Sequence, residues 1–585
     1  MHKFLNTLSL TAILLFSLSA CGVSNNTDTE TLTNTTVTTA DLIFLGDNII
    51  TMDSNTQGAT AIAVQGKNII ATGNQQQLLK FKGDNTRVIE LGEQLLTPGF
   101  IDSHGHLGLT ARFIDFVNLS SPPVGEVNNI GNLVETLQSR IASDPPDENE
   151  WLVGFGYDDS LLAEATHPTR DDLDKVSKDI PIVIIHVSGH LGVINSAAIK
   201  LSDLTATTPD PAGGVIRRYE NSNEPNGVLE ESALSLILYT RLSEINTDAF
   251  TNMLGNTLEY YASHGITTIQ DGAVRPNDIK LFSDIAASNE FPVDVAAYRY
   301  FAPEDTQLIA NFKHQDEYTH GYRVAGVKFT TDGSPQGRTA WLTEPYHELP
   351  AGADDSYVAY PTVDSTNFIS AATQLIRNNT PIIVHTNGDA AIDLLNEAVS
   401  NALSDEIERD HRTVAIHAQL MRADQLDLAA QLKIIPSFFS AHAFFWGDWH
   451  LKSFGQERGE NISPTRWAKD RGVTFTVHND APIVPPDMLR LLWATVNRET
   501  RSGNIIGPHQ RMTPVEALEA ITSDAAFQYF EEDVKGSISV GKQADLVIIS
   551  EDIRSIDPKR IKDLEIMETF SRGVSVYKKE VEDSD

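Results

Sequence analysis

Short segments of alternating hydrophobic and polar residues begin at about residue 40. Apolar runs at 41–45, 48–52, 61–64 and 68–71 are separated by Gly and Asn residues, and this pattern is typical of β-strands joined by turns. The segment 536–549, near the other end of the chain, has the same character. We therefore predict a small β-sandwich domain built from both chain ends, residues 40–96 and 534–585.

Between these ends, apolar runs rich in β-branched residues recur with amphipathic stretches after them. Eight such runs are candidate strands: 96–102, 266–269, 293–298, 325–330, 381–384, 414–416, 434–438 and 473–477. A predicted helix at 390–399 follows the fifth run, and Thr513-Pro-Val-Glu516 combines an N-cap, Pro at the first helical position and a capping-box Glu. Eight strands alternating with helices predict an α/β fold with a TIM-type (β/α)8 barrel over residues 97–533.

The first two predicted barrel strands are far apart in the sequence. The interval, about 108–255, contains further candidate strands at 151–155 and 181–186, and it is too long for an ordinary connection. We predict an inserted α/β subdomain. Because it follows a strand, it should lie over the catalytic face of the barrel. A role as a lid or in shaping the substrate site is the resulting hypothesis.

The chain begins like an exported protein. Lys3 precedes an apolar stretch at 12–16, and small residues precede Cys21, which predicts a signal peptide over residues 1–20. Leu18-Ser-Ala-Cys21 resembles the lipobox of bacterial lipoproteins, in which the cysteine is acylated; an ordinary signal peptide that contains a cysteine is the alternative. Residues 21–39 are polar and predict a disordered tether. These features predict a lipid-anchored protein of the bacterial cell envelope that faces the periplasm or the exterior.

Composition limits the partners and the metal ligands. The 585 residues include 44 Lys and Arg against 80 Asp and Glu, a formal charge of -36, so nucleic acid and anionic lipid faces would be repelled. Cys21 is the only cysteine. Internal disulfides and thiolate metal sites are therefore excluded, and nitrogen and oxygen atoms must hold any metal. A homodimer is one candidate for the oligomeric state, which the sequence leaves open.

Candidate metal ligands stand at the ends of the predicted barrel strands. His104 and His106 follow the first strand, and residues two apart in an extended chain point the same way. Four further candidates lie in or after later strands: Lys328, His385, His417 and Asp480. Each one alone is compatible with a buried histidine, a salt-bridging lysine or a helix cap. Because the carboxyl ends of barrel strands meet at one mouth, together they predict a metal site.

The same residues carry a family resemblance. Residues 96–106 look like the first-strand motif of the amidohydrolase superfamily. Five further segments resemble the YtcJ-like amidohydrolase family, which also includes N-substituted formamide deformylase: 189–198, 227–231, 326–333, 385–390 and 479–482. The resemblance extends from about residue 40 to residue 577.

The resemblance implies a ligand set and a mechanism. His104, His106 and Asp480 would bind one divalent metal, His385 and His417 a second, with Lys328 bridging them as a carbamate. The implied cofactor is one or two Zn²⁺, although such ligands also permit Mn, Fe or Ni. A metal-bound hydroxide would attack the scissile carbonyl of a small-molecule amide or related compound, cleaving a C–N bond that is not a peptide bond. Asp480 would take the water proton and pass it to the leaving nitrogen.

Other residues are weaker candidates for substrate contact. Asp271 at the end of the second strand, Arg338, and His478 two residues before Asp480 could each face the substrate, or could serve packing and turns. Aromatic residues at 444–450 either bind an apolar group or pack the loop. The family commonly has an acidic residue where this chain has Ile416, and a cysteine-bridged D-aminoacylase mechanism is excluded by the lack of a suitable cysteine.

Two other functions are compatible with such a site. The same centre could hydrolyse an ester, lactone or phosphotriester, because an activated water attacks several electrophiles. A catalytically idle barrel that binds a ligand at the envelope is the second rival.

Overall fold

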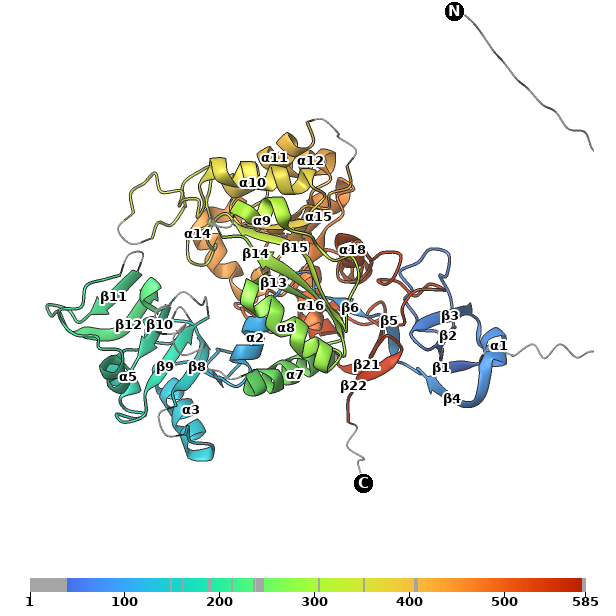
Figure 1. Cartoon of the computed structure of the whole chain (residues 1–585), viewed down its shortest axis with the longest axis horizontal. Coiled ribbons are helices and arrows are strands. Elements are labelled where there is room, and N and C mark those ends of the chain that lie inside the picture. The colour runs from blue at the N-terminus through green and yellow to red at the C-terminus, as the bar shows by residue number, and fades with distance from the viewer. Residues whose placement is uncertain are drawn as a thin grey trace, which may run out of the picture. The chain divides into compact units, whose positions relative to one another are not determined.

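The computed structural model describes residues 39–580, except for 148–149, 160, 188, 190, 212–213, 235–236, 238–246, 303–305, 351–352 and 405–408 (Figure 1). The predicted signal peptide, Cys21 and nearly all of the predicted tether lie outside the described residues. Within the described part, none of the helices combines the length and the apolar character that a membrane span requires. The domain boundaries drawn from the sequence stay predictions.

A parallel sheet of eight strands forms the centre of the fold, in the order β19-β18-β17-β16-β15-β14-β13-β6. Its strands are β6 (Phe100–Ile101), β13 (Ile266–Val274), β14 (Asp294–Tyr300), β15 (Tyr322–Thr330), β16 (Ile382–Thr386), β17 (Val414–His417), β18 (Ile435–Phe438) and β19 (Thr476–Val477). The first and last strands meet just beyond their carboxyl ends, where Asp480 N donates to His104 O at 3.1 Å and His106 N to Ala481 O at 2.8 Å. The sheet therefore curls round in the manner of a TIM-type barrel.

The first predicted strand, 96–102, is divided between two sheets. β5 (Leu95–Pro98) pairs antiparallel with a strand near the C-terminus, and only Phe100–Ile101 pair with β13. The chain changes sheet at Gly99, where a Cβ atom would come within 2.4 Å of Thr267 Oγ1. Glycine is therefore required for this close approach.

Helices alternate with the barrel strands. Their bounds are α7 (Thr247–Ser263), α8 (Pro276–Ser288), α9 (Thr306–Asn311), α10 (Ser365–Arg377), α11 (Asp389–Ala402), α12 (Ala423–Leu432), α13 (His442–Phe445), α14 (Gly447–Glu460), α15 (Thr465–Asp470), α16 (Met488–Asn497), α17 (Pro514–Glu519) and α18 (Ser523–Gln528). In α10, Phe368, Ala371, Ala372 and Leu375 are buried, a spacing that places them on one helix face. The predicted cap of α17 is confirmed: Thr513 is the N-cap and forms a capping box with Glu516.

Two four-stranded sheets come from the chain ends. The first has the order β3-β2-β1-β4, from β1 (Ala40–Leu45), β2 (Ala61–Gln65), β3 (Asn68–Gly73) and β4 (Lys82–Glu90), with the short helix α1 (Gln75–Leu78) after β3. The second has the order β22-β21-β20-β5, with β20 (Leu546–Ile549), β21 (Ile566–Ser571) and β22 (Val574–Lys578). Both contribute to one hydrophobic cluster, in which the rings of Phe44 and Phe570 meet edge to face at 5.2 Å.

Two predicted strand segments near the chain ends are not strands over their whole length. At 48–52 the chain makes one isolated bridge, from Ile49 to Leu96, and the φ of Met52 is +53°, which ends the extended conformation. At 536–549 only the last four residues form a strand, since Gly536 and Gly541 have φ values of +82° and +94°. Period-two alternation does not reveal such interruptions.

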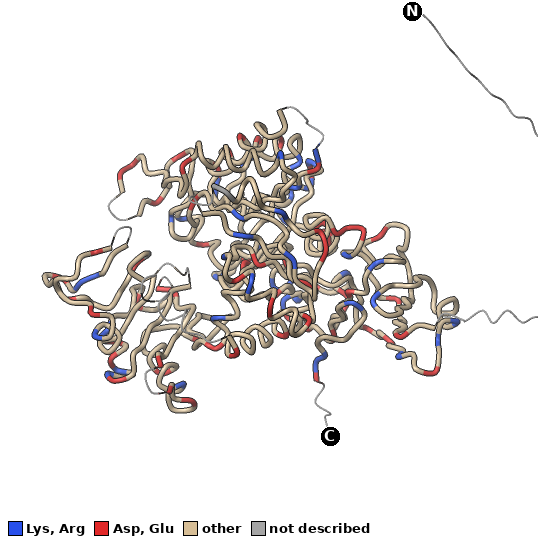
Figure 2. The backbone as a smooth tube through the Cα atoms, in the orientation of Figure 1, with Lys and Arg blue, Asp and Glu red and all other residues tan. Residues whose placement is uncertain are grey.

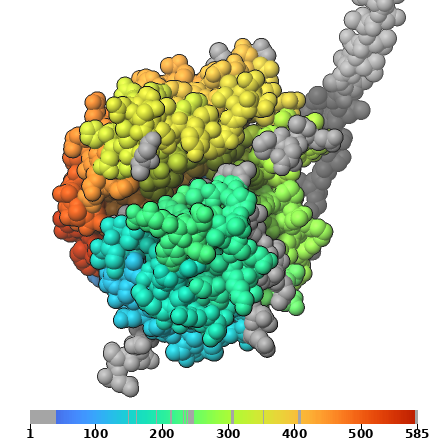
Figure 3. Space-filling view, turned by 90° about the vertical axis from the view of Figure 1, so that its left-hand side faces the viewer, coloured from blue at the N-terminus to red at the C-terminus, as the bar shows by residue number. Residues whose placement is uncertain are grey.

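A third sheet lies within the interval after β6, in the order β11-β12-β10-β9-β8-β7. Its strands are β7 (Val117–Asn118), β8 (Leu152–Tyr157), β9 (Ile182–His186), β10 (Leu191–Ile194), β11 (Gly214–Arg218) and β12 (Pro225–Glu231), accompanied by α2 (Leu107–Phe113), α3 (Ile130–Ser143), α4 (Arg170–Leu173) and α5 (Ser196–Leu201). We call residues 117–231 the inserted segment; it is cyan to green in Figure 3. The predicted end at about 255 falls inside α7. Figure 2 shows acidic and basic residues interspersed over these elements.

A buried ion cluster ties β14 to the C-terminal part of the chain. Lys535 Nζ lies 2.5 Å from Asp294 Oδ2 and 3.2 Å from Glu531 Oε2, and Arg572 Nη1 lies 2.6 Å from Asp294 Oδ1. Burial by itself would lower the pKa of Lys535, but Asp294 and Glu531 raise that pKa well above its ordinary value. The cluster therefore keeps Lys535 charged inside the protein.

Replacing this lysine is expected to cost substantial stability. Lys535→Met removes the buried cation that Asp294 and Glu531 share, so we expect the free energy of unfolding, measured by urea denaturation, to fall by about 3–5 kcal/mol. The matched control is Lys469→Met, which breaks the partly exposed pair with Glu519 and should cost no more than about 1 kcal/mol. Equal losses in the two variants would contradict the structural role of the cluster.

Candidate metal centre

The carboxyl ends of the barrel strands surround a cavity of about 920 Å³. Six predicted metal ligands line it: His104, His106, Lys328, His385, His417 and Asp480. His104 and His106 follow the first barrel strand, β6, and Asp480 follows the last one, β19. The other three side chains belong to the strands β15, β16 and β17. The structure thus brings together all the residues for which a ligand role was predicted, while the roles themselves stay predictions.

Three of these side chains converge on one point. His106 Nε2 lies 3.2 Å and His104 Nε2 3.5 Å from Asp480 Oδ1, and the ligand atoms all lie within 4.8 Å of one another. Around a tetrahedral cation with bonds of about 2.0 Å, ligand atoms are roughly 3.3 Å apart. Asp480 Oδ1 is also buried without a hydrogen-bond partner among the described residues. The donor set therefore fits a divalent cation.

The ring of His104 is oriented by a residue that the sequence reasoning did not identify. Gln270 Oε1 lies 2.5 Å from His104 Nδ1, and Gln270 Nε2 donates to Tyr529 Oη at 2.8 Å. The amide oxygen can only accept, so Nδ1 carries the proton and Nε2 presents its lone pair to the cavity. Gly272 makes room for this ring, because a Cβ atom there would lie 2.4 Å from His104 Cε1. The Gln-Asp-Gly sequence within β13 was the available signal.

Lys328 is buried in the same centre. Its Nζ lies 3.1 Å from His104 Nε2, and burial lowers the pKa of Lys328 to about 7. A neutral amine at this position is compatible with a cation nearby and with reaction with carbon dioxide, whereas an ammonium group would repel the cation. The carbamate itself stays a prediction.

A chain of imidazoles forms the other side of the centre. His385 Nδ1 lies 3.1 Å from His417 Nε2, His417 Nδ1 lies 3.1 Å from His478 Nε2, and His478 Nδ1 lies 2.8 Å from Ser437 Oγ. Burial lowers the pKa of His417 and of His478 well below the ordinary value, and neighbouring imidazoles add to the effect. Both rings are therefore neutral.

One arrangement of protons is consistent with all these contacts. His385 Nε2 donates to Gly333 O at 2.9 Å, His417 Nδ1 donates to His478, and His478 Nδ1 donates to Ser437. The lone pairs of His385 Nδ1 and His417 Nε2 then face each other, and their separation matches the roughly 3.3 Å between neighbouring ligands of a tetrahedral cation. His478 orients His417 and is not among the described residues that line the cavity.

The two remaining substrate candidates occupy different places. Asp271 lines the cavity; its Oδ2 accepts from Gly108 N at 2.9 Å, and burial raises its pKa to about 6. Arg338 is not among the described lining residues. Its guanidinium donates to Ser453 Oγ at 3.1 Å and lies 4.4 Å from the centroid of the Trp449 ring, so it packs the loop. A substrate role for Arg338 has no support from this position.

Two further polar residues were missed by the sequence reasoning. Asp332, after β15, accepts hydrogen bonds from the backbone of Asn387 at 3.0 Å and of Gly388 at 2.7 Å, and it thereby fixes the loop after His385. His442, at the start of α13, lines the cavity. Asp332 lies within 326–333, one of the segments that resemble the family, so the sequence offered a reason to consider it. For His442 the only indication in the sequence was its position after the seventh predicted strand.

Comparisons with known proteins agree with this geometry. A model of the Amidohydrolase family matches residues 87–577. N-substituted formamide deformylase from Arthrobacter pascens is 26% identical over 561 residues, 92% of this chain and 98% of that protein. Putative amidohydrolase YtcJ from Bacillus subtilis is 26% identical over 556 residues, 92% of this chain and 99% of that protein.

The fold has a counterpart of known structure. The crystal structure of a metal-dependent hydrolase from Pyrococcus furiosus aligns with a TM-score of 0.68 at 23% identity, covering 88% of this chain and 99% of that one. This likeness shows a shared fold. Since the family match extends over most of the sequence, the chain belongs to the amidohydrolase family.

Proposed function

We propose that this protein is a zinc-dependent amidohydrolase that cleaves a small amide in the cavity at the barrel mouth. Family membership makes it a hydrolase of C–N bonds other than peptide bonds; zinc and the amide substrate are the finer proposals. The observation that carries them is the convergence of His104, His106 and Asp480, with Asp480 Oδ1 buried and without a hydrogen bond among the described residues.

The donor atoms at the mouth suit one or two divalent cations. His104, His106 and Asp480 would hold the first, and His385 and His417 the second, with Lys328 contributing to either. A cation in such a site acidifies water and polarises a carbonyl group. Nitrogen and oxygen donors of this kind are ordinary zinc ligands.

Asp480 supplies the proton transfers in this proposal. Water adds to the carbonyl carbon, and a proton of the water passes to the Asp480 carboxylate. The C–N bond then breaks as Asp480 returns the proton to the leaving nitrogen, which gives a carboxylic acid and an amine. The Nε2 atoms of His104 and His106 lie beside this carboxylate and would share the cation with it, and Asp271 lines the same cavity.

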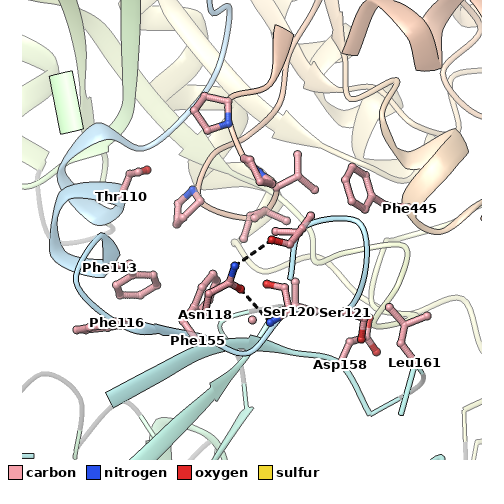
Figure 4. A pocket seen from close by; sticks show the side chains of 18 of the residues that line it. Thr110, Phe113, Phe116, Asn118, Ser120, Ser121, Phe155, Asp158, Leu161 and Phe445 are labelled. Atoms are coloured by element: carbon pink, nitrogen blue, oxygen red, sulfur yellow. Dashed lines mark hydrogen bonds between the residues drawn. The ribbon is translucent and has the colours of Figure 1, made fainter. Parts of the chain in front are cut away.

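A second, mostly apolar cavity could bind an apolar substituent of the substrate. It has a volume of about 330 Å³ and is lined by Phe155 of the inserted segment, by Phe116 directly before that segment, and by barrel residues that include Phe445 (Figure 4). Ile483 lines this cavity and also the cavity of the metal centre, so the two share a wall. We infer that the apolar part of the amide lies here, which is one of the two roles considered for the aromatic segment 444–450.

Filling this cavity is expected to discriminate between substrates. Val124→Trp places an indole in a cavity that Val124 lines, so KM for N-benzylformamide should rise by about 10- to 100-fold, the equivalent of burying one apolar side chain. KM for N-methylformamide should change little. The matched control is Val215→Trp, at an exposed position of β11. Equal changes for both substrates would exclude this cavity as a substituent site.

The proposed activity is tested by metal removal and substrate comparison. Chelator-treated protein is reloaded with Zn²⁺ and assayed with formamides, aryl esters and lactones of matched size. We expect amide turnover to fall at least about 100-fold on chelation and to return with zinc. Faster turnover of the oxygen compounds would favour an ester or lactone hydrolase, and binding without turnover of any compound by the loaded protein would favour the non-catalytic rival.

We also propose that the protein is anchored in the bacterial cell envelope through acylated Cys21. The lipobox-like Leu18-Ser-Ala-Cys21 supports this, together with the polar segment that follows it. Cys21→Ser should abolish labelling by a fatty-acid analogue and release the protein from the membrane fraction. Unchanged labelling would contradict lipidation at this residue. Ser19→Thr, before the cysteine, is the control that should retain both properties.

A further inference from the structure

A second group of metal-ligating side chains lies in the inserted segment. Asp158 and Asp159 follow β8, and His186 ends β9. The two strands are parallel neighbours, with Tyr157 opposite His186. Their carboxyl ends therefore bring two carboxylates and an imidazole to the same edge of this sheet. None of these residues lines the cavity of the metal centre at the barrel mouth.

The distances within this group are those of a cation site. His186 Nε2 lies 3.1 Å from Asp159 Oδ1 and 3.9 Å from Asp158 Oδ1, and the three ligand atoms lie within 4.8 Å of one another. Ligand atoms around a tetrahedral cation are roughly 3.3 Å apart, so small shifts of the carboxylates would complete the geometry.

His167 supplies a fourth donor. Its Nε2 lies 3.8 Å from Asp159 Oδ2, and its Nδ1 lies 3.2 Å from the hydroxyl of Tyr157. The buried phenol can accept the Nδ1 proton, which leaves the Nε2 lone pair turned toward Asp159. A hydrogen bond to the second ring nitrogen is the usual support for a metal-ligating histidine.

The charges at this edge also favour a cation. His186 faces both carboxylates, with Asp159 Oδ1 at 3.1 Å and Asp158 Oδ1 at 3.9 Å, so two acidic side chains share one imidazole. Nearby Arg217 is paired with Glu230, and Arg501, which interacts electrostatically with Asp158, also donates a hydrogen bond to Pro122 O. A divalent cation would neutralise both carboxylates together.

We propose that Asp158, Asp159, His167 and His186 form a second binding site for a divalent transition metal, separate from the centre at the barrel mouth. Two nitrogen and two oxygen donors suit zinc, manganese or nickel. Because Asp158 also lines the apolar cavity (Figure 4), the bound cation would fix one wall of that cavity.

The test is the zinc content at saturation of the full-length protein, measured by mass spectrometry after chelation, reloading and desalting. Two variants remove ligands, His186→Gln and Asp159→Asn; the second is conservative and partly exposed, so it guards against misfolding. Asp179→Asn, at an exposed carboxylate of the same segment, is the matched control. We expect both ligand variants to bind about one equivalent less than wild type and the control to bind the same amount.

The readout does not depend on catalysis. Zinc bound at the barrel mouth is a common background for all four proteins, whether or not the proposed activity is found. Equal zinc contents in wild type, His186→Gln and Asp159→Asn, including the case in which none is bound, would overturn the proposal and leave the group as an ion-pair network.

Discussion

Asp480→Asn is expected to reduce kcat/KM for the amide substrate by about 10³- to 10⁴-fold while the fold is retained. The carboxylate has two tasks in the proposed reaction, because it holds a cation together with His104 and His106 and carries the proton from water to the leaving nitrogen. An amide at this position keeps the size of the side chain but cannot take up the proton. Steady-state kinetics with zinc-saturated protein measure the change in kcat/KM, and circular dichroism shows whether the fold is retained.

The matched control for this variant is Asp487→Asn. Asp487 follows on the same segment of chain and caps α16, where its side chain accepts from Arg490 N. An asparagine side chain can do the same, so the control should retain activity and stability. Activity of Asp480→Asn within about tenfold of wild type would remove Asp480 from the proton-transfer role.

Lys328→Arg is expected to lower the metal content of the protein and to reduce kcat by at least about 100-fold. Lys328 Nζ is buried 3.1 Å from His104 Nε2, and only a neutral or carboxylated nitrogen is tolerated beside a cation. The guanidinium group of arginine stays charged and cannot form the carbamate. Lys469→Arg, in the partly exposed pair with Glu519, is the control.

Labelled bicarbonate distinguishes the two roles considered for Lys328. Zinc-loaded wild-type protein equilibrated with ¹³C-bicarbonate should show a carbamate carbon resonance that Lys328→Arg lacks. If the resonance is missing from active wild-type protein, Lys328 acts as a neutral amine and the bridging carbamate is wrong. Full activity of Lys328→Arg would contradict both roles.

The barrel strands and the convergence of the candidate ligands on one cavity could be predicted because strand ends are encoded locally. Apolar β-branched runs marked the strands, and each polar residue directly after a run marked a position at the mouth. His104 and His106 show this best: both follow shortly after the first barrel strand, and both Nε2 atoms lie close to Asp480 Oδ1. No long-range information was needed for these positions.

The same rule failed for His478. It stands two positions before Asp480, so an extended chain would have placed both on one face. The last barrel strand ends at Val477, however, and the φ of Asp480 is +57°. The chain has left the extended conformation, and His478 points to His417 and Ser437. Pattern reasoning cannot detect a single left-handed residue.

Residues that act through other residues were the hardest to predict. Gln270 orients His104, and Asp332 fixes the loop after His385; both depend on partners distant in the sequence. Arg338 is the opposite case, since a charged residue considered for substrate contact packs against Trp449. Side-chain partners of this kind follow from the tertiary fold, which the local sequence does not specify.

The central claim is that His104, His106 and Asp480 hold a divalent cation at the barrel mouth. Anomalous diffraction at the zinc edge, from crystals of protein purified with zinc, tests it most directly. We expect an anomalous peak at bonding distance from both Nε2 atoms and from Asp480 Oδ1, roughly 2.0–2.2 Å. Zinc-loaded, active crystals without density at this point would contradict the account.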